Sequence, residues 1–388
     1  MRLQESDFSY VASRNRMPLY PGLVALGIRD GQTREEIFEA AKRWNTWLAL
    51  GCLAVVAGIF FRSLPVHAAM NATFLSAFTV FLFKAPHVQA EVLYYTLGFV
   101  FFVLCWSLFR RPSWAGAVLA GGVAGLAHLT KASIAPAVFC FVVFYCLDAL
   151  WQRRGTAATG SLHRFALVAL VCAGFLTVIF PYISKSKEIY GHYFYNVNST
   201  FYFWCDSWKD AVERTKGAGD RTGWPNLAPE QTPGPANYFR THSAGDIGAR
   251  IGSGISRVFK SMTRSYGYFG FVVALAVACA VVAAQKRRLL WRLFRVRPAP
   301  ALALAAYFCG YALLIIWYSQ IISGNRFILA LFLPFVFSTF VFLAAFSRDV
   351  RLFRLPLWPV FNTVFSIALA AEIAVICLVR IPHLYGGD

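Results

Sequence analysis

The sequence has little charge. Asp, Glu, Lys and Arg make up only 14% of its 388 residues, whereas a soluble globular domain has about 25%. Hydrophobic residues supply 58% of the chain, and the mean hydropathy is +0.55. This composition excludes an ordinary soluble domain and predicts an integral membrane protein.

Acidic residues are especially scarce. Asp and Glu number 18 against 37 Lys and Arg, which gives a formal net charge of +19. In a soluble protein such an excess would indicate a nucleic-acid partner. Here the basic residues cluster in loops beside apolar runs, as the positive-inside rule predicts, so no nucleic acid is expected.

Three further absences narrow the class of protein that the sequence can encode. The N-terminus has neither an apolar h-region nor a small-residue cleavage site, so it is not read as a signal peptide. Eight of the nine cysteines lie in apolar runs and only Cys205 lies in a polar loop, so neither a disulfide framework nor paired zinc-ligand spacing is visible. Ten-residue alternation of apolar and polar residues is also missing, and the spans are expected to be helices.

Long apolar runs fill most of the chain. A helix of about 20 residues crosses the roughly 30 Å hydrocarbon layer. Runs of this kind lie near residues 44–61, 68–84, 91–109, 114–130, 133–151, 165–184, 267–285, 300–322, 327–346 and 357–379. They predict an all-α polytopic bundle of about ten transmembrane helices with one large outward-facing loop.

Charge in alternate loops predicts the orientation. One set of loops is basic and almost free of acid, and short basic loops face the cytoplasm. This set comprises Arg62, Arg110–Arg111, Arg153–Arg154 with Arg164, Lys286–Arg297, and Arg348, Arg351 and Arg354. The expected organisation is an outward first loop (1–43), a first bundle (44–184), a large outward loop (185–266) and a second bundle (267–388).

The first loop begins with a polar, aromatic head. Thr33 followed by Glu36 is a capping box at a helix start. Apolar residues then recur at helical spacing up to Trp44. We expect a short amphipathic helix in the membrane interface, the alternative being the exposed start of the first span.

Four segments carry a family resemblance. They are DFSYVASRNRMPLYP (Asp7–Pro21), QAEVLYYTLGF (Gln89–Phe99), AGLAHLTKASIAP (Ala124–Pro136) and SGNRFILALFLPF (Ser323–Phe335). In order and sidedness they resemble the GT-C superfamily of glycosyltransferases that use polyprenyl-phosphate sugars. The chain looks most like bacterial protein-mannosyltransferase-like and aminoarabinose lipid A transferase-like proteins. This resemblance implies a sugar transferase of the bacterial inner membrane with its active site on the periplasmic side.

One feature departs from that pattern. The family begins with a membrane helix ahead of the acidic first loop, whereas this sequence starts within the loop. We expect that the first transmembrane helix is lacking from the sequence as given.

Two acids are the candidate catalytic residues. Sugar transfer needs a base for the acceptor hydroxyl, and Asp7 corresponds to the family's first-loop acid. Glu91 is expected to face it, orienting the acceptor or helping to bind a divalent cation. Whether the reaction needs such a cation is unknown. Asp7 as a solvated loop residue, and Glu91 as an acid favoured by the helix dipole, are the alternatives.

Four basic residues are candidates for binding the donor phosphate. Arg suits bidentate phosphate recognition and Lys acts as a point charge. Lys131 and Arg326 lie at outward ends of spans, while Arg14 and Arg16 lie in the head. The alternative for Lys131 and Arg326 is snorkelling to lipid headgroups.

Aromatic residues are candidates for binding substrate. Trp204 and Trp208 in the large loop are suited to stacking on sugar faces, or equally to an interfacial aromatic belt. Tyr10 and Tyr20 of the head join this set. The expected partners are a polyprenyl-phosphate sugar, the lipid bilayer, and a glycan, lipid or protein acceptor. A transporter or flippase of lipid-linked sugars is the alternative function, although the internal repeats typical of transporters are not seen.

Overall fold

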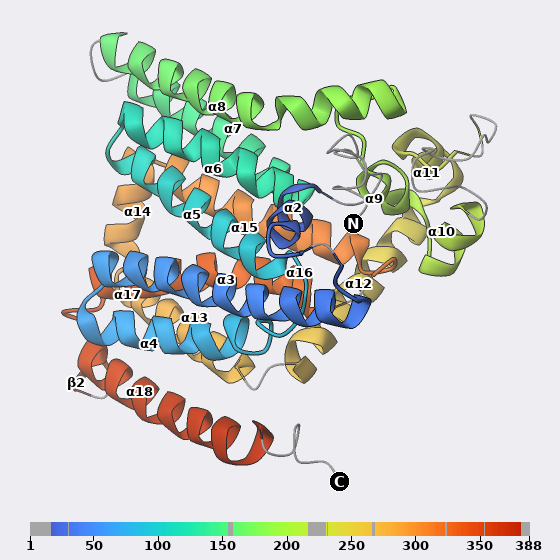
Figure 1. Ribbon diagram of the computed structural model, residues 1–388. Coiled ribbons are helices and arrows are strands. Elements are labelled where there is room, and N and C mark those ends of the chain that lie inside the picture. Colours follow the sequence, from blue (N-terminus) through green and yellow to red (C-terminus); the bar gives the residue numbers. More distant parts are fainter. Residues whose placement is uncertain are drawn as a thin grey trace.

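The computed structural model describes residues 17–29, 31–153, 158–215, 230, 232–265, 268–322, 324–352 and 354–381. Over these residues most of the long helices run side by side in one bundle (Figure 1). Within these described ranges, seven helices are long and apolar enough to cross a membrane, and an eighth crossing results if a bent helix pair counts as one span. Two shorter apolar helices, Val66–Phe81 and Trp114–Thr130, accompany them. The chain is therefore a multi-pass, all-α membrane protein, as predicted, while the number of about ten crossings and the large outward-facing loop (185–266) stay predictions.

The helices have the following bounds. They are α2 (Leu19–Ala25), α3 (Arg34–Ser63), α4 (Val66–Ser76), α5 (Glu91–Arg110), α6 (Trp114–Thr130), α7 (Ala135–Arg153), α8 (Ala158–Tyr190), α9 (Val197–Thr200), α10 (Trp208–Thr215), α11 (Pro235–Thr241), α12 (Ala244–Ser265), α13 (Phe269–Gln285), α14 (Arg287–Val296), α15 (Ala299–Tyr318), α16 (Asn325–Ile328), α17 (Phe332–Phe346) and α18 (Leu357–Val375). Two-residue strands, β1 (Arg351–Leu352) and β2 (Leu355–Pro356), pair antiparallel ahead of α18.

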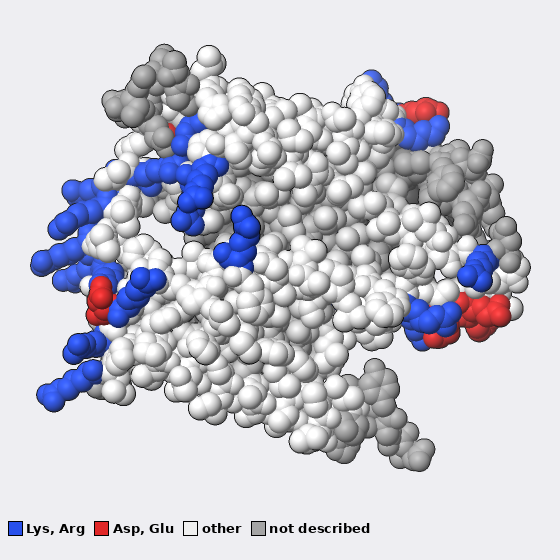
Figure 2. Space-filling view, turned by 60° about the vertical axis from the view of Figure 1, so that its left-hand side comes forward, with Lys and Arg blue, Asp and Glu red and all other residues white. Residues whose placement is uncertain are grey.

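The two ends of the bundle differ in charge and in structure. Lys and Arg side chains gather at one end, which we call the basic end (Figure 2). Helix α14 and the β1–β2 pair lie there (Figure 1). The opposite end, which we call the loop end, carries the short helices α9 to α11 and the helix α12. Acidic and basic side chains are mixed at the loop end. The charge asymmetry between alternate loops of the sequence is therefore a difference between the two ends of the bundle.

Small residues bring α6 and α8 into close contact. A Cβ atom at Gly121 would lie 2.5 Å from the Val171 carbonyl oxygen and 3.1 Å from the Gly174 Cα. One turn later, a Cβ at Gly125 would lie 2.5 Å from the Cβ of Val178. Helices approach this closely only where side chains are absent, as in other membrane bundles. The two helices therefore form a tight pair beside α5.

A buried carboxylate links three segments at the basic end. Asp148 of α7 is fully buried, and Arg164 of α8 donates to it with a nitrogen–oxygen distance of 2.9 Å. Arg297, directly after α14, donates its Nε to the other oxygen at 2.8 Å. Two guanidinium groups thus contact the buried carboxyl group, and such pairing offsets the cost of burying it. Asp148 was not among the residues expected from the sequence to matter, although it lies in an apolar run.

The start of α3 corrects one prediction. The capping box is confirmed, since the Thr33 side chain accepts from the Glu36 amide and Glu36 accepts from the Thr33 amide. The separate amphipathic helix is wrong, because α3 continues without a break from Arg34 to Ser63. No proline interrupts this stretch, and the residues around Trp44 are compatible with helix throughout.

Candidate functional site

Three of the predicted site residues meet at the loop end. Glu91 opens α5, Lys131 caps the end of α6 and Arg326 lies in α16. The Glu91 Oε1 lies 3.5 Å from the Lys131 Nζ and 3.9 Å from the Arg326 Nη1. Lys131 follows Glu91 by 40 positions and Arg326 follows Lys131 by 195, yet both basic side chains contact the same Glu91 oxygen. We call these three residues the Glu91 cluster.

The two basic side chains of the Glu91 cluster are more exposed to solvent than the acidic one. The Glu91 side chain is 9% exposed, whereas Lys131 is 27% and Arg326 is 37% exposed. Burial lowers the pKa of the Lys131 ammonium, an effect that Glu91 opposes and Arg326 reinforces. One buried acid therefore holds two partly accessible basic side chains, and the cluster contains one more basic group than acidic groups. Such an arrangement suits an anionic ligand.

Aromatic rings position the two cations. Phe327 contacts both of them, with its ring centroid 5.0 Å from the Lys131 Nζ and 5.2 Å from the Arg326 Cζ. The Tyr95 hydroxyl donates to the Arg326 backbone carbonyl and so fixes α16 against α5. Cation–π contacts of this kind restrict the cations without neutralising them. Their charge stays available to a ligand.

The loop that leads into Glu91 is held by one buried side chain. The Asn45 amide of α3 donates to the carbonyls of Ala85 and His87, each at 2.7 Å. The Tyr20 hydroxyl of α2 donates to the Asn45 Oδ1 at 2.9 Å. These bonds fix the position of the first turn of α5 relative to α3. Tyr20 therefore supports the Glu91 cluster through Asn45, whereas the sequence predicted that it would bind substrate.

Tyr20 is the only predicted head residue that falls within the described part of the chain. Burial, and after it the charge of Glu91, raise the pKa of the Tyr20 hydroxyl to about 12. The hydroxyl is therefore protonated at any physiological pH and acts as a donor. Asp7, Tyr10, Arg14 and Arg16 lie outside the described residues.

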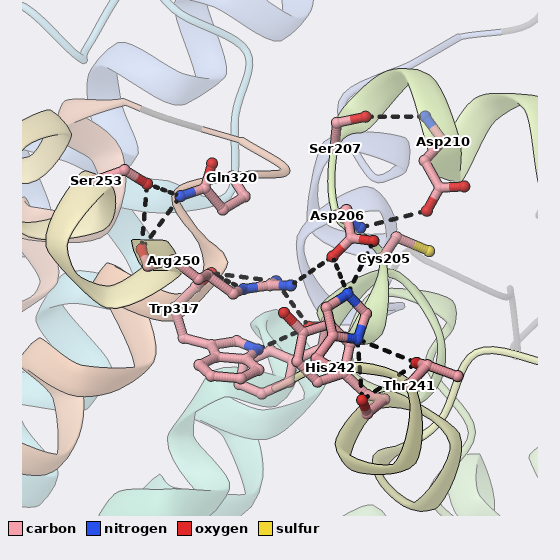
Figure 3. A network of polar contacts seen from close by, with 12 residues as sticks. Cys205, Asp206, Ser207, Asp210, Thr241, His242, Arg250, Ser253, Trp317 and Gln320 are labelled. Atoms are coloured by element: carbon pink, nitrogen blue, oxygen red, sulfur yellow. Dashed lines mark hydrogen bonds and ion pairs between the residues drawn. The ribbon is translucent and has the colours of Figure 1, made fainter. Parts of the chain in front are cut away.

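A second polar cluster joins α12 and the segment 203–206 to the end of α15. Arg250 of α12 is 6% exposed and stacks on Trp317, with 4.4 Å between its Cζ and the ring centroid (Figure 3). Its Nη2 donates to the Phe203 carbonyl at 3.2 Å, and its Nη1 lies 3.6 Å from the Asp206 Oδ1. His242 contacts the same carboxylate at 3.2 Å. We call this set the Arg250 cluster.

The predicted loop tryptophans belong to this region. Trp204 packs in the Arg250 cluster, with its ring 5.9 Å from Trp317 and 6.0 Å from Tyr238. Trp208 lies against Tyr202 at 5.8 Å and is 48% exposed. Trp204 is thus engaged in packing the loop, while Trp208 keeps an accessible face.

One contact chain connects the two clusters. Tyr318, directly after Trp317, packs its ring edge against Phe327 at 5.8 Å. Its hydroxyl donates to the Asn198 side-chain carbonyl of the large loop at 3.0 Å. Movement of the segment around Asn198 would therefore shift Tyr318 and, through it, the Phe327 ring that contacts Lys131 and Arg326.

The members of the Arg250 cluster were missed in the sequence. Asp206, His242 and Arg250 are separated by 36 and 8 positions, and no spacing pattern relates them. The same holds for Asn45, whose burial is a consequence of the loop that folds over it. Among the described residues, no three His, Cys, Asp or Glu side chains gather closely enough to hold a metal ion.

Comparisons with protein-family models, with curated proteins and with solved structures found no match for this chain.

Proposed function

We propose that this chain is a membrane glycosyltransferase that moves a sugar from a polyprenyl-phosphate donor to an acceptor hydroxyl. The observation that carries the proposal is the Glu91 cluster, in which two partly exposed cations and one buried acid meet at one end of a membrane bundle. The phosphate of a membrane lipid lies at the headgroup level of the bilayer. From that level it would reach a site at the end of the bundle. The motif resemblance of the sequence supports the same reaction.

The chemistry assigns a role to each group. The acceptor oxygen forms a bond to the anomeric carbon, the bond from that carbon to the phosphate oxygen breaks, and polyprenyl phosphate leaves. Lys131 and Arg326 stabilise the phosphate as its charge develops. Asp7 accepts the proton of the acceptor hydroxyl. Glu91 keeps both cations aimed at one place and orients the acceptor.

The position of the loop end follows from the same proposal. The basic end would face the cytoplasm, and the Glu91 cluster would face the periplasmic side of a bacterial inner membrane. The Arg250 cluster would then anchor the large loop over the outer surface, where Trp208 is available to contact a sugar.

The test uses the chain reconstituted in lipid vesicles with labelled polyprenyl-phosphate sugars and candidate acceptors. Asp7→Asn and Glu91→Gln should each lower the transfer rate about a hundredfold or more, the range for loss of a general base or of a preorganised electrostatic group. Glu188→Gln is the control, because Glu188 is an exposed acid in α8 that pairs with Lys185, three residues before it.

Two outcomes would contradict the assignment. Transfer that survives both Asp7→Asn and Glu91→Gln removes these residues from the chemistry. Movement of the labelled donor across the vesicle membrane without transfer would instead identify a flippase, which needs the phosphate-binding cations but no base.

A further inference from the structure

Helix α14 differs from every other helix at the basic end. It follows α13 after a bend of 85°, and it is connected to α15 by the two residues Arg297 and Pro298. None of its residues is buried. Because apolar helices precede and follow it, α14 is held beside the bundle where α13 ends and α15 begins.

Its side chains fall on distinct faces. Arg288, Arg292 and Arg295 recur at helical spacing and share one face. Leu289, Leu293 and Val296 share the neighbouring face and are 42%, 48% and 74% exposed. Leu290 and Phe294 are only partly exposed and lie on a third face. The helix therefore presents an arginine face and an apolar face that the protein does not cover.

The residues at the two ends of α14 pair with acids. Lys286 pairs with Asp349 at 3.6 Å, and Arg297 pairs with the buried Asp148. Within the part of the chain that the structure describes, Arg288, Arg292 and Arg295 pair with no acid. Three guanidinium groups on one face thus lack a counter-charge, while the flanks fix the helix in place.

We infer that α14 lies in the surface of the bilayer and is a binding site for anionic phospholipid headgroups. Arg288, Arg292 and Arg295 contact the headgroup phosphates, and Leu289, Leu293 and Val296 insert among the acyl chains. A basic amphipathic helix binds an anionic lipid surface through the sum of these two terms. This inference is independent of the proposed transferase activity.

The observations favour lipid over a soluble partner. The exposed leucines and valine lie on a helix that joins the apolar helices α13 and α15 directly, so the lipid around those two helices is the nearest surface that can cover them. The uncompensated arginines complement the negative charge of an anionic leaflet. Neither feature requires a further protein or a nucleic acid.

The test compares lipids retained by the full-length protein. The protein is equilibrated with equal amounts of phosphatidylglycerol and phosphatidylcholine of the same chain length, and the bound lipids are counted by native mass spectrometry. Wild type should retain phosphatidylglycerol in severalfold excess. The triple variant Arg288→Gln/Arg292→Gln/Arg295→Gln should lose more than half of that excess.

A matched control removes the same charge from the same end. Arg110→Gln/Arg111→Gln/Arg348→Gln alters three exposed arginines outside α14 and should keep the excess. All variants should have the wild-type melting temperature in nanodiscs of phosphatidylcholine alone. In nanodiscs that also contain phosphatidylglycerol, wild type and control should melt at higher temperature, and the α14 variant should gain less than half of that rise.

Three results would overturn the inference. One is equal retention of phosphatidylglycerol by wild type and the α14 variant, and another is equal loss in the α14 and control variants. The third is an equal rise in melting temperature when inorganic phosphate replaces phosphatidylglycerol, which would assign the arginines to a free anion.

Discussion

At the residue scale, the Glu91 cluster shows how a buried acid prepares a cationic site. An acid with 9% exposure beside two cations is stable because they neutralise it, and in return it holds their positive ends at one point. Arg326 is the more exposed cation, and its guanidinium group can bind two phosphate oxygens at once. In the proposed transfer reaction, its contribution should therefore concern the donor.

Arg326→Ala should raise the KM for the lipid-phosphate donor about tenfold or more, since a charge-assisted hydrogen bond contributes about 1.5–3 kcal/mol. The KM for the acceptor should change little. Initial rates measured with each substrate varied in turn give both values. Arg240→Gln, an exposed arginine of α11, is the control. An unchanged donor KM would leave Arg326 as a residue that only reaches toward lipid headgroups.

Asp148 gives a second prediction for a single residue. Asp148→Ala leaves Arg164 and the partly exposed Arg297 without their carboxylate, and breaking a fully buried ion pair costs about 3–5 kcal/mol, which is an upper bound here. The melting temperature in detergent should fall strongly. Asp349→Ala removes an acid that is 87% exposed and should cause little change. Similar melting temperatures for the two variants would contradict a structural role for the buried acid.

At the element scale, apolar periodicity indicated most of the helices but not where they end. The run 165–184 lies inside α8, which continues at both ends to Ala158 and Tyr190. Hydropathy cannot mark these ends, because a helix can extend past the apolar layer with polar residues. The segment 286–297 read as a basic loop, yet it forms α14, whose arginines are compatible with helix.

Close packing of α6 on α8 provides a test with neighbouring residues. Gly121→Ala places a Cβ 2.5 Å from a backbone carbonyl oxygen of α8, whereas a Cβ at Gly122 meets no atom within 4 Å. Overpacking of this kind costs about 1–3 kcal/mol. Gly121→Ala should lower the melting temperature in detergent, and Gly122→Ala should not. Equal behaviour of the two variants would mean that the helices are not in close contact at Gly121.

At the scale of the whole molecule, the alternation of basic loops along the sequence predicts that Glu91, Lys131 and Arg326 lie at the same end of the bundle. This alternation cannot place Lys131 and Arg326 within 4 Å of the Glu91 carboxylate, because those distances depend on how α5, α6 and α16 are rotated. The Arg250 cluster was beyond prediction for a related reason. Its members come together only when the large loop folds back on α15, and nothing in their spacing encodes that contact.

The separation of the two ends is itself testable. Lys209 in α10 and Asp349 after α17 have side chains that are 85% and 87% exposed, and they lie at the loop end and the basic end. A membrane-impermeant maleimide added to intact cells should label Lys209→Cys and spare Asp349→Cys until the membrane is opened. The wild-type protein gives the background from its own cysteines. Labelling of both variants in intact cells would contradict a bilayer between these ends.

The unbroken length of α3 sets a depth for the site. Its 30 residues extend about 45 Å, which exceeds the roughly 30 Å of the hydrocarbon layer. From Ser63 back to Asn45 the helix rises about 27 Å, close to one layer thickness. If Ser63 lies at one boundary of that layer and α3 runs along its normal, Asn45 lies near the opposite boundary, together with the loop ahead of α5 that it holds. A lipid that brings its phosphate to Lys131 and Arg326 would therefore keep its chain at its resting depth in the bilayer.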